Sequence, residues 1–332
     1  MDKFQAFVLE KQGDQAAGSI QTLGHDRLPD GEVTIRVRYS SINYKDAMAA
    51  QPVSPIVKSY PFVPGIDLAG EVVHSDDPSF AVGDEVLVTG YELGVSHPGG
   101  FSQLARVPAD WVVPLPDGLT AREAMSLGTA GFTAALSVLQ MERNGLRPEQ
   151  GPVLVTGATG GVGSVVVSLL SKLGYRVTAS TGKLAESEYL LGLGAAEVIE
   201  RDALIPPDGK PLRKERWAGA VDPVGGASLP FILSTLRYGG SAAVSGLTGG
   251  ADFATTVYPF ILRGVKLLGI DSVYCDTLTR REVWSRLAAD WKPVSYLETG
   301  AREIGLGNLA DTLAAIRSGR LRGRAIVNLD LS

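Results

Sequence analysis

The sequence has very little of the chemistry that metal clusters and disulfides require. Among its 332 residues there is one cysteine, Cys275, and the three histidines, His25, His74 and His97, lie far apart along the chain. A single cysteine forms no intramolecular disulfide, and these few residues do not offer the clustered ligands of a structural zinc site. The counts therefore predict a protein of a reducing compartment without a metal centre.

Strong net charge and long apolar runs are also missing. The 31 Lys and Arg residues against 36 Asp and Glu residues give a net charge of −5, which provides no general attraction to nucleic acid or to an anionic membrane. The first residues, MDKFQAFVLEKQ, lack the basic and then apolar pattern of a signal peptide, and no uninterrupted apolar run approaches about 18 residues. We therefore expect a cytoplasmic protein that binds neither nucleic acid nor membrane.

Glycine, in contrast, is abundant, with 40 residues, and the pattern along the chain changes once. From residue 1 to about 119, short β-branched runs are broken by Gly, Pro and Asp, which indicates a mostly β, partly barrel-like domain. After residue 121, an apolar strand, a glycine turn and a helix follow one another repeatedly, which is typical of a doubly wound parallel sheet. Beyond residue 272 come two helical patterns, 279–291 and 308–318, and a final strand-like run.

The strongest chemical signal is the segment VLVTGATGGVGS, residues 153–164. It follows an apolar strand directly and opens an amphipathic helix, which is the context that makes a glycine fingerprint meaningful. Gly160 and Gly161 allow the backbone to approach a diphosphate, Gly163 allows close packing on the sheet, and the helix N-terminus offers free N–H donors. The segment predicts a dinucleotide site, and the alternative is an ordinary tight turn between a strand and a helix.

The end of the next strand indicates which dinucleotide is bound. Sites that prefer NAD usually carry an acid there, which binds the ribose hydroxyls, but this chain reads ASTGK and has no acid before Glu186. Hydroxyls and an ammonium group suit a 2′-phosphate, which a carboxylate would repel. The alternative is a solvated lysine at a helix start. We predict that the chain binds NADP(H), with the phosphate held by Ser180, Thr181, Gly182 and Lys183.

Five segments together resemble the medium-chain dehydrogenase/reductases over nearly the whole chain: 43–46, 64–71, 83–86, 128–133 and the glycine turn at 157–163. The resemblance implies an α/β fold with two domains. One is a GroES-like, mostly β catalytic domain at about 1–124, completed by 273–332. The other is a Rossmann NADP-binding domain at about 125–272. It also implies a homodimer formed through the sheet edge near 265–270, because an apolar edge strand favours a partner.

The positions where zinc-dependent members have their zinc ligands indicate which branch of the family this chain resembles. Those members have a Cys near the first motif and a His-Glu pair after the Pro-Gly, whereas this chain has Asn43-Tyr44 and Ile66-Asp67. It is therefore most similar to the zinc-free, quinone oxidoreductase-like branch, and within it to the YhdH/YhfP group. Characterised members of that group reduce acryloyl-CoA with NADPH.

Tyr44 is the candidate catalytic residue, because the resemblance places it at the cleft over the nicotinamide. Its phenol can donate to an enolate oxygen or to a cofactor hydroxyl. The alternative is a tyrosine at a strand end whose hydroxyl is in water. Asn43 and Asp46 either orient Tyr44 or satisfy a turn, and we favour the turn for Asp46. Asp67 is expected to be a backbone acceptor.

The remaining cofactor contacts follow from strand ends and from the resemblance. Ligands bind at the carboxyl ends of parallel strands, so the loops after the fifth and sixth strands should face the nicotinamide. Arg324 reaches the cofactor by resemblance, and a surface arginine is the alternative. His97 is expected to be a loop histidine and Cys275 a partly buried small residue. Besides Tyr44, the predicted cofactor contacts outside the phosphate site are Thr159, Gly160, Gly161, Val162, Leu247, Ser272 and Arg324.

These expectations combine into an oxidoreductase with a small-molecule substrate. The preferred hypothesis is NADPH-dependent reduction of an activated C=C bond, acryloyl-CoA to propionyl-CoA, by hydride transfer without a metal. One alternative is an NADPH:quinone oxidoreductase on the same fold. An alternative of another class is a non-catalytic NADPH-binding structural or RNA-binding protein, against which the acidic net charge argues.

Overall fold

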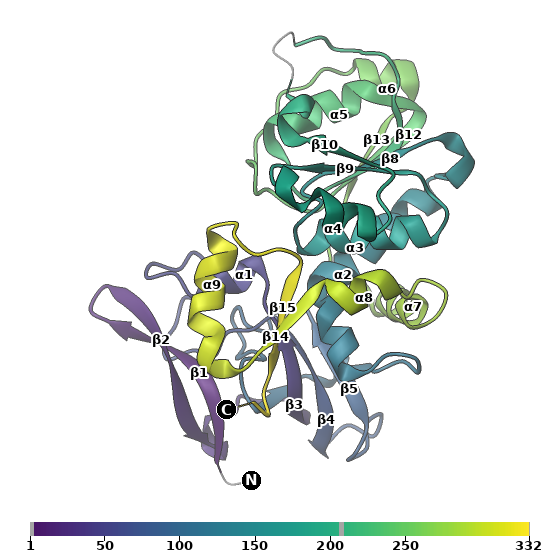
Figure 1. The fold of residues 1–332 in the computed structure, drawn as a ribbon. Coiled ribbons are helices and arrows are strands. Elements are labelled where there is room, and N and C mark those ends of the chain that lie inside the picture. Colours follow the sequence, from purple (N-terminus) through teal and green to yellow (C-terminus); the bar gives the residue numbers. More distant parts are fainter. Residues whose placement is uncertain (1–2, 206–208, 332) are drawn as a thin grey trace. The chain divides into compact units, whose positions relative to one another are not determined.

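The computed structural model describes residues 3–205 and 209–331, which form two compact units. Unit 1 comprises residues 1–129 and 301–332, and unit 2 comprises residues 130–300. The predicted fold class, a GroES-like mostly β domain with a Rossmann-type parallel sheet, is confirmed. Each unit is described by itself below, with the element labels of Figure 1.

Unit 1 is built on antiparallel strands. A sheet runs in the order β14-β15-β3-β4-β5-β7, with β6 paired to β3, and β1 and β2 form a separate hairpin. Among the strands that the structure describes in this unit, β14 and β15 are the pair that runs in parallel. The strands are β1 (Lys3–Gln12), β2 (Gln15–Gly24), β3 (Val33–Ser41), β4 (Asp67–Ser75), β5 (Glu85–Thr89), β6 (Leu104–Val107), β7 (Val113–Pro114), β14 (Ala301–Ile304) and β15 (Arg324–Asn328).

Two helices lie wholly in unit 1, α1 (Tyr44–Ala49) and α9 (Leu309–Arg317), and they contact each other. Buried apolar side chains of β3, β4 and β15, among them Ile35, Leu68 and Val327, form one core with Leu309 and Leu313 of α9. The short β-branched runs expected in residues 1–119 thus include β3 and β4, whose buried side chains meet this core.

Unit 2 carries a six-stranded parallel sheet in the order β10-β9-β8-β11-β12-β13. Figure 1 shows α5 and α6 on one side of this sheet and α3 and α4 on the other. The strands are β8 (Val153–Val155), β9 (Val177–Thr181), β10 (Glu197–Glu200), β11 (Trp217–Asp222), β12 (Leu236–Val244) and β13 (Lys266–Gly269). The helices are α3 (Gly161–Lys172), α4 (Ser187–Gly192), α5 (Leu229–Thr235), α6 (Tyr258–Arg263), α7 (Thr277–Ala288) and α8 (Val294–Thr299).

The order of the parallel strands explains why the central ones read as continuous apolar runs. β8 lies between β9 and β11, and all three of its residues are buried. A parallel strand with helices on both faces has no polar side to present. The same order brings the carboxyl ends of all six strands to one edge, where the loops that follow them gather.

The compact units divide the chain differently from the predicted domains in two segments, and the shorter one is residues 125–129, which lie in unit 1. Residues 273–300 were expected to complete the first domain, but they lie in unit 2. Trp284 of α7 stacks with Phe132, with 6.1 Å between the ring centroids, and the guanidinium of Arg280 lies 4.8 Å from the centre of the same ring. Aromatic and cation–π contacts of this kind attach α7 to the residues that follow Thr129.

One helix, α2 (Ala121–Arg143), is long and apolar enough to cross a membrane by length and composition. Its apolar window is 89% buried inside the protein, as expected of a core helix. It is also broken at Gly128, which has φ +52° and ψ −157°. Unit 1 ends at the next residue, Thr129.

Candidate functional site

The glycine turn between β8 and α3 has the geometry of a phosphate-binding loop. Gly157 has φ +54°, a left-handed conformation that favours glycine. A side chain on Gly163 would overlap the backbone of Gly157 and Ala158, so the helix packs against the turn only because that position is glycine. Gly160 precedes the first turn of α3, where Gly161 and Val162 present unpaired N–H groups to an anion.

The end of β9 lies directly against this turn. The Ala158 N–H donates to the Ser180 carbonyl over 3.0 Å, and the hydroxyls of Thr159 and Thr181 are 3.1 Å apart. The Thr181 hydroxyl also accepts the Lys183 N–H at 3.0 Å. The structure thus brings the predicted diphosphate loop and the predicted 2′-phosphate residues together. Thr181 shapes the loop from inside, because it is 1% exposed.

Sequence reasoning missed a second cation at this place, Arg201. It follows β10, whose last residue, Glu200, is the register partner of Thr181. A side-chain carbon on Gly182 would lie 3.1 Å from the central guanidinium carbon of Arg201. The Arg201 side chain is 63% exposed and its ion pair with Asp202 is long, at 3.7 Å. Arg201 therefore adds a guanidinium to the ammonium of Lys183 beside one exposed glycine.

Asp222, at the end of β11, is a buried anchor of the same sheet edge. Its carboxylate accepts the Thr156 hydroxyl at 2.5 Å and the Val224 N–H at 3.1 Å, and it accepts the Gly225 N–H as well. These bonds tie the start of the glycine turn to the loop after β11. Asp222 is 0% exposed, so its role is to hold the edge of the site rather than to meet a ligand.

The loops after β12 and β13 lie at the same edge, as predicted. Leu247 follows β12 and is 63% exposed. The Ser272 loop follows β13. Arg280 fixes this loop, because its guanidinium donates to the carbonyls of Ser272 and Val273 at 3.1 and 3.0 Å. Arg280 is itself fully buried. Whether Leu247 and Ser272 touch a cofactor stays a prediction.

Tyr44, the predicted catalytic residue, is the first residue of α1 and is 43% exposed. The helix begins there because Asn43 is its N-cap and the Asp46 carboxylate accepts the Asn43 N–H at 2.7 Å. The other oxygen of Asp46 accepts the Ile66 N–H at 3.0 Å. Asp46 therefore satisfies the turn, as we favoured, and it also ties the turn to the residue before Asp67.

Asp67 is more than the backbone acceptor that the sequence suggested. Its carboxylate accepts the Asn43 side-chain amide and the Thr129 N–H, both at 2.8 Å, and it also accepts the hydroxyls of Ser41 and Thr129. Asp67 is 0% exposed. The hydrogen-bonding needs of this buried carboxylate are therefore met by side chains and backbone from several segments.

Arg324 lies in the same buried cluster and is 3% exposed, so the alternative of a surface arginine is wrong. Its guanidinium donates to the Asn43 side-chain oxygen at 3.0 Å and to the Ser41 hydroxyl at 2.5 Å, and it is 3.6 Å from the Asp67 carboxylate. β15 carries Arg324 to this place from the end of the chain. That it reaches a cofactor stays a prediction.

The buried carboxyl of Asp46 has an unusual pKa. Burial, together with the negative charge of Asp67, raises the pKa of Asp46 from 3.8 to about 7, although the hydrogen bonds from Asn43 and Ile66 oppose the shift. Desolvation disfavours a charged carboxylate, and a second carboxylate nearby does the same. The segment that presents Tyr44 therefore contains a carboxyl group that is partly protonated at neutral pH.

Two other residues occupy the places that the sequence suggested. His97 lies in a loop, with its Nδ1 3.0 Å from the Pro98 carbonyl and its ring edge-on to Trp111. Cys275 is half-buried, and burial raises the pKa of its thiol. A thiol with a raised pKa is a weak nucleophile at neutral pH. Within residues 3–205 and 209–331 the structure shows no group of three His, Cys, Asp or Glu side chains placed to hold a metal ion.

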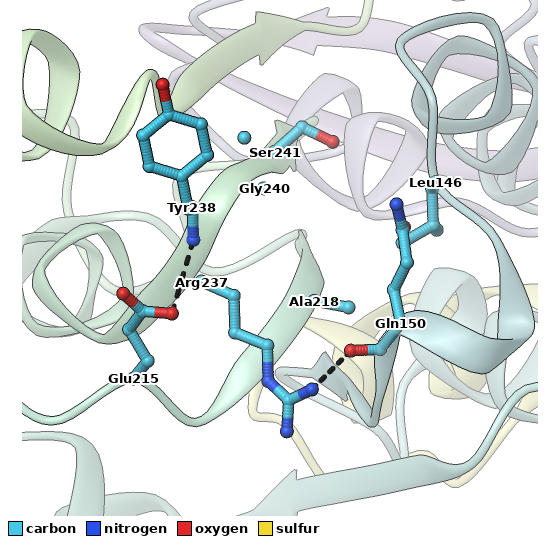
Figure 2. A pocket seen from close by; sticks show the side chains of 9 residues that line it. Leu146, Gln150, Glu215, Ala218, Arg237, Tyr238, Gly240 and Ser241 are labelled. Carbon is cyan, nitrogen blue, oxygen red and sulfur yellow. Dashed lines mark hydrogen bonds between the residues drawn. The ribbon is translucent and has the colours of Figure 1, made fainter.

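A pocket of about 220 Å³ opens in unit 2 at the other end of the sheet. Figure 2 shows its lining: Arg237, Tyr238, Gly240 and Ser241 come from the first half of β12, and Ala218 comes from the start of β11. Arg237 donates to the Gln150 carbonyl, and the Tyr238 N–H donates to Glu215 at 3.4 Å. Cofactors of this fold bind at the carboxyl ends of the strands, so this pocket is not the cofactor site.

Comparison with known protein families matches one family model to the first part of the chain and another to the second. The family described as "Alcohol dehydrogenase GroES-like domain" matches residues 29–117, and the family described as "Zinc-binding dehydrogenase" matches residues 161–289.

Similar proteins extend over the whole chain. The Bacillus subtilis protein named "Putative quinone oxidoreductase YhfP" is 54% identical over 98% of this chain and 99% of its own length. The acrylyl-CoA reductase AcuI of Ruegeria pomeroyi is 47% identical over 98% of this chain and 99% of its own length.

The folds of solved relatives are nearly superimposable on this one. The yhdH oxidoreductase of Salmonella enterica, crystallised with NADP, has a TM-score of 0.95 at 46% identity and covers 98% of this chain and 99% of its own. Crystalline B. subtilis YhfP, with NAD bound, has a TM-score of 0.97 and covers 99% of this chain and 100% of its own.

Proposed function

Because the chain belongs to the medium-chain dehydrogenase/reductase family, we propose that it is an NADPH-dependent reductase of an activated C=C bond, with acryloyl-CoA as its substrate. The observation that carries the proposal is the glycine turn of β8 and α3 beside Lys183 and Arg201, with no carboxylate at the end of β9. The substrate is supported by the name of the AcuI relative.

The residues present fit NADP(H). Gly163 lets α3 pack directly against the Gly157–Gly163 turn, and the N–H groups at the start of α3 suit a diphosphate. Lys183 and Arg201 suit a 2′-phosphate. The NADP in the Salmonella relative is consistent with this choice, while the NAD in YhfP makes NADH the comparison that any binding experiment needs.

NADPH, when bound, supplies a hydride to the β-carbon of the acceptor. The protein then has to orient the acceptor, exclude water and stabilise negative charge on the thioester oxygen. Tyr44 is the side chain we assign to that oxygen, because it begins α1 with its ring half-exposed and a phenol is a good donor. Asn43 and Ile66 stand at the positions where other members have zinc ligands. We therefore assign the stabilisation of the negative charge to hydrogen bonds.

The proposal is tested by following NADPH consumption at about 340 nm with acryloyl-CoA, crotonyl-CoA, simple enones and quinones. We expect rapid consumption with acryloyl-CoA and formation of propionyl-CoA. Slow turnover of acryloyl-CoA beside fast reduction of quinones would contradict the proposal that acryloyl-CoA is the substrate. It would favour the second candidate function, an NADPH:quinone oxidoreductase, which the name of YhfP supports.

We also propose a cytoplasmic homodimer formed through the β13 edge of unit 2. β13 pairs only with β12 in the described sheet, so its other edge carries free backbone groups. The neighbouring α6 exposes Ile261 and Leu262 at 69% and 55%. A second copy of the chain would cover both the open edge and these apolar side chains.

A further inference from the structure

A buried cluster of charged and polar groups surrounds the side chain of Asn43, the residue before Tyr44. Its centre is Asp67, the first residue of β4, whose carboxylate accepts hydrogen bonds from Ser41, Asn43 and Thr129. Arg324, from β15, is the counter-charge at 3.6 Å. Both charged side chains are at least 97% buried.

The cluster fixes one amide group from both ends. The Nδ2 of Asn43 donates to the Asp67 carboxylate at 2.8 Å, and the Oδ1 of Asn43 accepts from the Arg324 guanidinium at 3.0 Å. An anion at one end and a cation at the other allow only one orientation of that amide. The Asn43 N–H is bound to Asp46 as well. The next residue is Tyr44, so the start of α1 is held in place by charge.

The same carboxylate determines where α2 breaks. Gly128 has the left-handed φ of +52°, and a side chain there would overlap the Ser41 hydroxyl, the Arg324 guanidinium and the Asp67 carboxylate together. The N–H of the following residue, Thr129, donates to the Asp67 carboxylate at 2.8 Å. The helix is therefore interrupted to make room for the cluster and to supply it with a donor.

A buried ion pair is weak evidence of a stabilising role, because the desolvation of its charges often offsets their attraction. The arrangement instead orients its neighbours: the Asp67 carboxylate binds the side chains of Ser41 and Asn43 just before Tyr44, and it binds Thr129 after the break in α2. We propose that Asp67 is a positioning residue of the reductase, which acts with Arg324 and Gly128 to hold the Asn43–Tyr44 segment in the orientation that Tyr44 needs. This inference rests on the function proposed above.

The first test is the variant Asp67→Asn beside Asp117→Asn, an exposed aspartate of the same unit. For Asp67→Asn we expect kcat to fall by at least about tenfold, while the Kd for NADPH changes by less than about threefold, because the glycine turn lies in unit 2. Asp117→Asn should change neither value. A folded Asp67→Asn protein with the kcat of the unaltered protein would overturn the inference.

A pH profile separates positioning from simple loss of structure. Asp46 faces the Asp67 carboxylate and the N–H groups of Asn43 and Ile66. Removing the charge of Asp67 lowers the pKa of Asp46, so the pH dependence of unfolding should move to lower pH in Asp67→Asn. If the unfolding free energy of Asp67→Asn is lower at every pH but depends on pH as in the unaltered protein, the inference is contradicted.

The variant Asn43→Ala keeps the Asp67–Arg324 pair and removes only the amide that it holds, so it tests the inference even if Asp67→Asn does not fold. We expect a loss of kcat of at least about tenfold with NADPH affinity retained. Full activity in this variant would overturn the positioning role. If the unaltered protein reduces no enoyl thioester, the proposed function fails instead, and the shift in the pH profile of unfolding still tests the cluster.

Discussion

At the residue scale, we propose that the two cations beside Gly182 determine which dinucleotide the protein binds. Lys183 and Arg201 come from the ends of neighbouring strands, and no carboxylate precedes Glu186 on that loop. A charge-assisted hydrogen bond to a phosphate is about twice as strong as a neutral one. The preference for NADPH over NADH should therefore depend on these two side chains and little else.

Lys183→Ala and Arg201→Ala should each weaken NADPH binding by about tenfold, or about 1.4 kcal/mol, and leave NADH binding nearly unchanged. The affinities can be measured by the change in nicotinamide fluorescence on titration. Lys214→Ala, at an exposed position of the same unit, is the matched control and should behave like the unaltered protein. An unchanged NADPH affinity in Lys183→Ala would remove this residue from the phosphate site.

Tyr44→Phe removes one hydroxyl and keeps the ring that begins α1. If the phenol stabilises charge on the substrate, kcat should fall by about tenfold to a hundredfold while the protein keeps its stability. Tyr238→Phe, at a 78% exposed position of unit 2, is the control. Equal kcat values for Tyr44→Phe and the control, measured by NADPH consumption, would show that the Tyr44 hydroxyl takes no part.

The raised pKa of Asp46 should make the unfolding free energy depend on pH. Its pKa in the folded protein is about 7, above the 3.8 of an ordinary aspartate, so the folded protein holds this proton after the unfolded chain has lost it. The free energy of unfolding should therefore fall by about 2 to 3 kcal/mol between pH 5 and pH 8. Urea unfolding across this range checks the sign, and a free energy that rises with pH would contradict it.

At the scale of elements, the turn between β8 and α3 depends on two glycines for different reasons. Gly157→Ala would strain a left-handed φ, and Gly163→Ala would push α3 away from the turn. We expect each to cost about 1 to 3 kcal/mol of unfolding free energy and to weaken NADPH binding by at least about tenfold. Gly192→Ala, in α4 with open space around it, is the control and should be neutral or slightly stabilising.

The elements that could be predicted from the sequence are those with a local pattern. The strand, turn and helix at 153–172 show an apolar run, glycines and a helical period within about twenty residues, and the structure has them there. The hairpin of β1 and β2 was not predicted, because nine of the ten residues of β2 are exposed or half-exposed and no apolar alternation marks the strand.

The features that could not be predicted from local patterns join distant parts of the chain. Arg201 meets Gly182 only because β10 and β9 pair in one register. Asp67 meets Ser41, Thr129 and Arg324 through three separate elements. Such contacts depend on tertiary pairing, and a single sequence carries no signal for them beyond the residue types themselves.

At the scale of the whole molecule, the open edge of β13 predicts the oligomeric state. If two copies pair there, the apolar side chains of α6 become buried in the interface. Ile261→Glu would place a charge in that interface and should convert a dimer into a monomer in sedimentation experiments. A monomer before any substitution would contradict the proposed homodimer without affecting the cofactor site.

We propose that a hydride passes from the cofactor to the β-carbon of an enoyl thioester. The most direct measurement is to reduce acryloyl-CoA with NADPH in which both hydrogens at C4 of the nicotinamide are deuterium, and to locate the deuterium in the product by NMR and mass spectrometry. We expect one deuterium at C3 of propionyl-CoA and a proton from water at C2. Consumption of NADPH without deuterium at C3 would contradict the proposed hydride transfer.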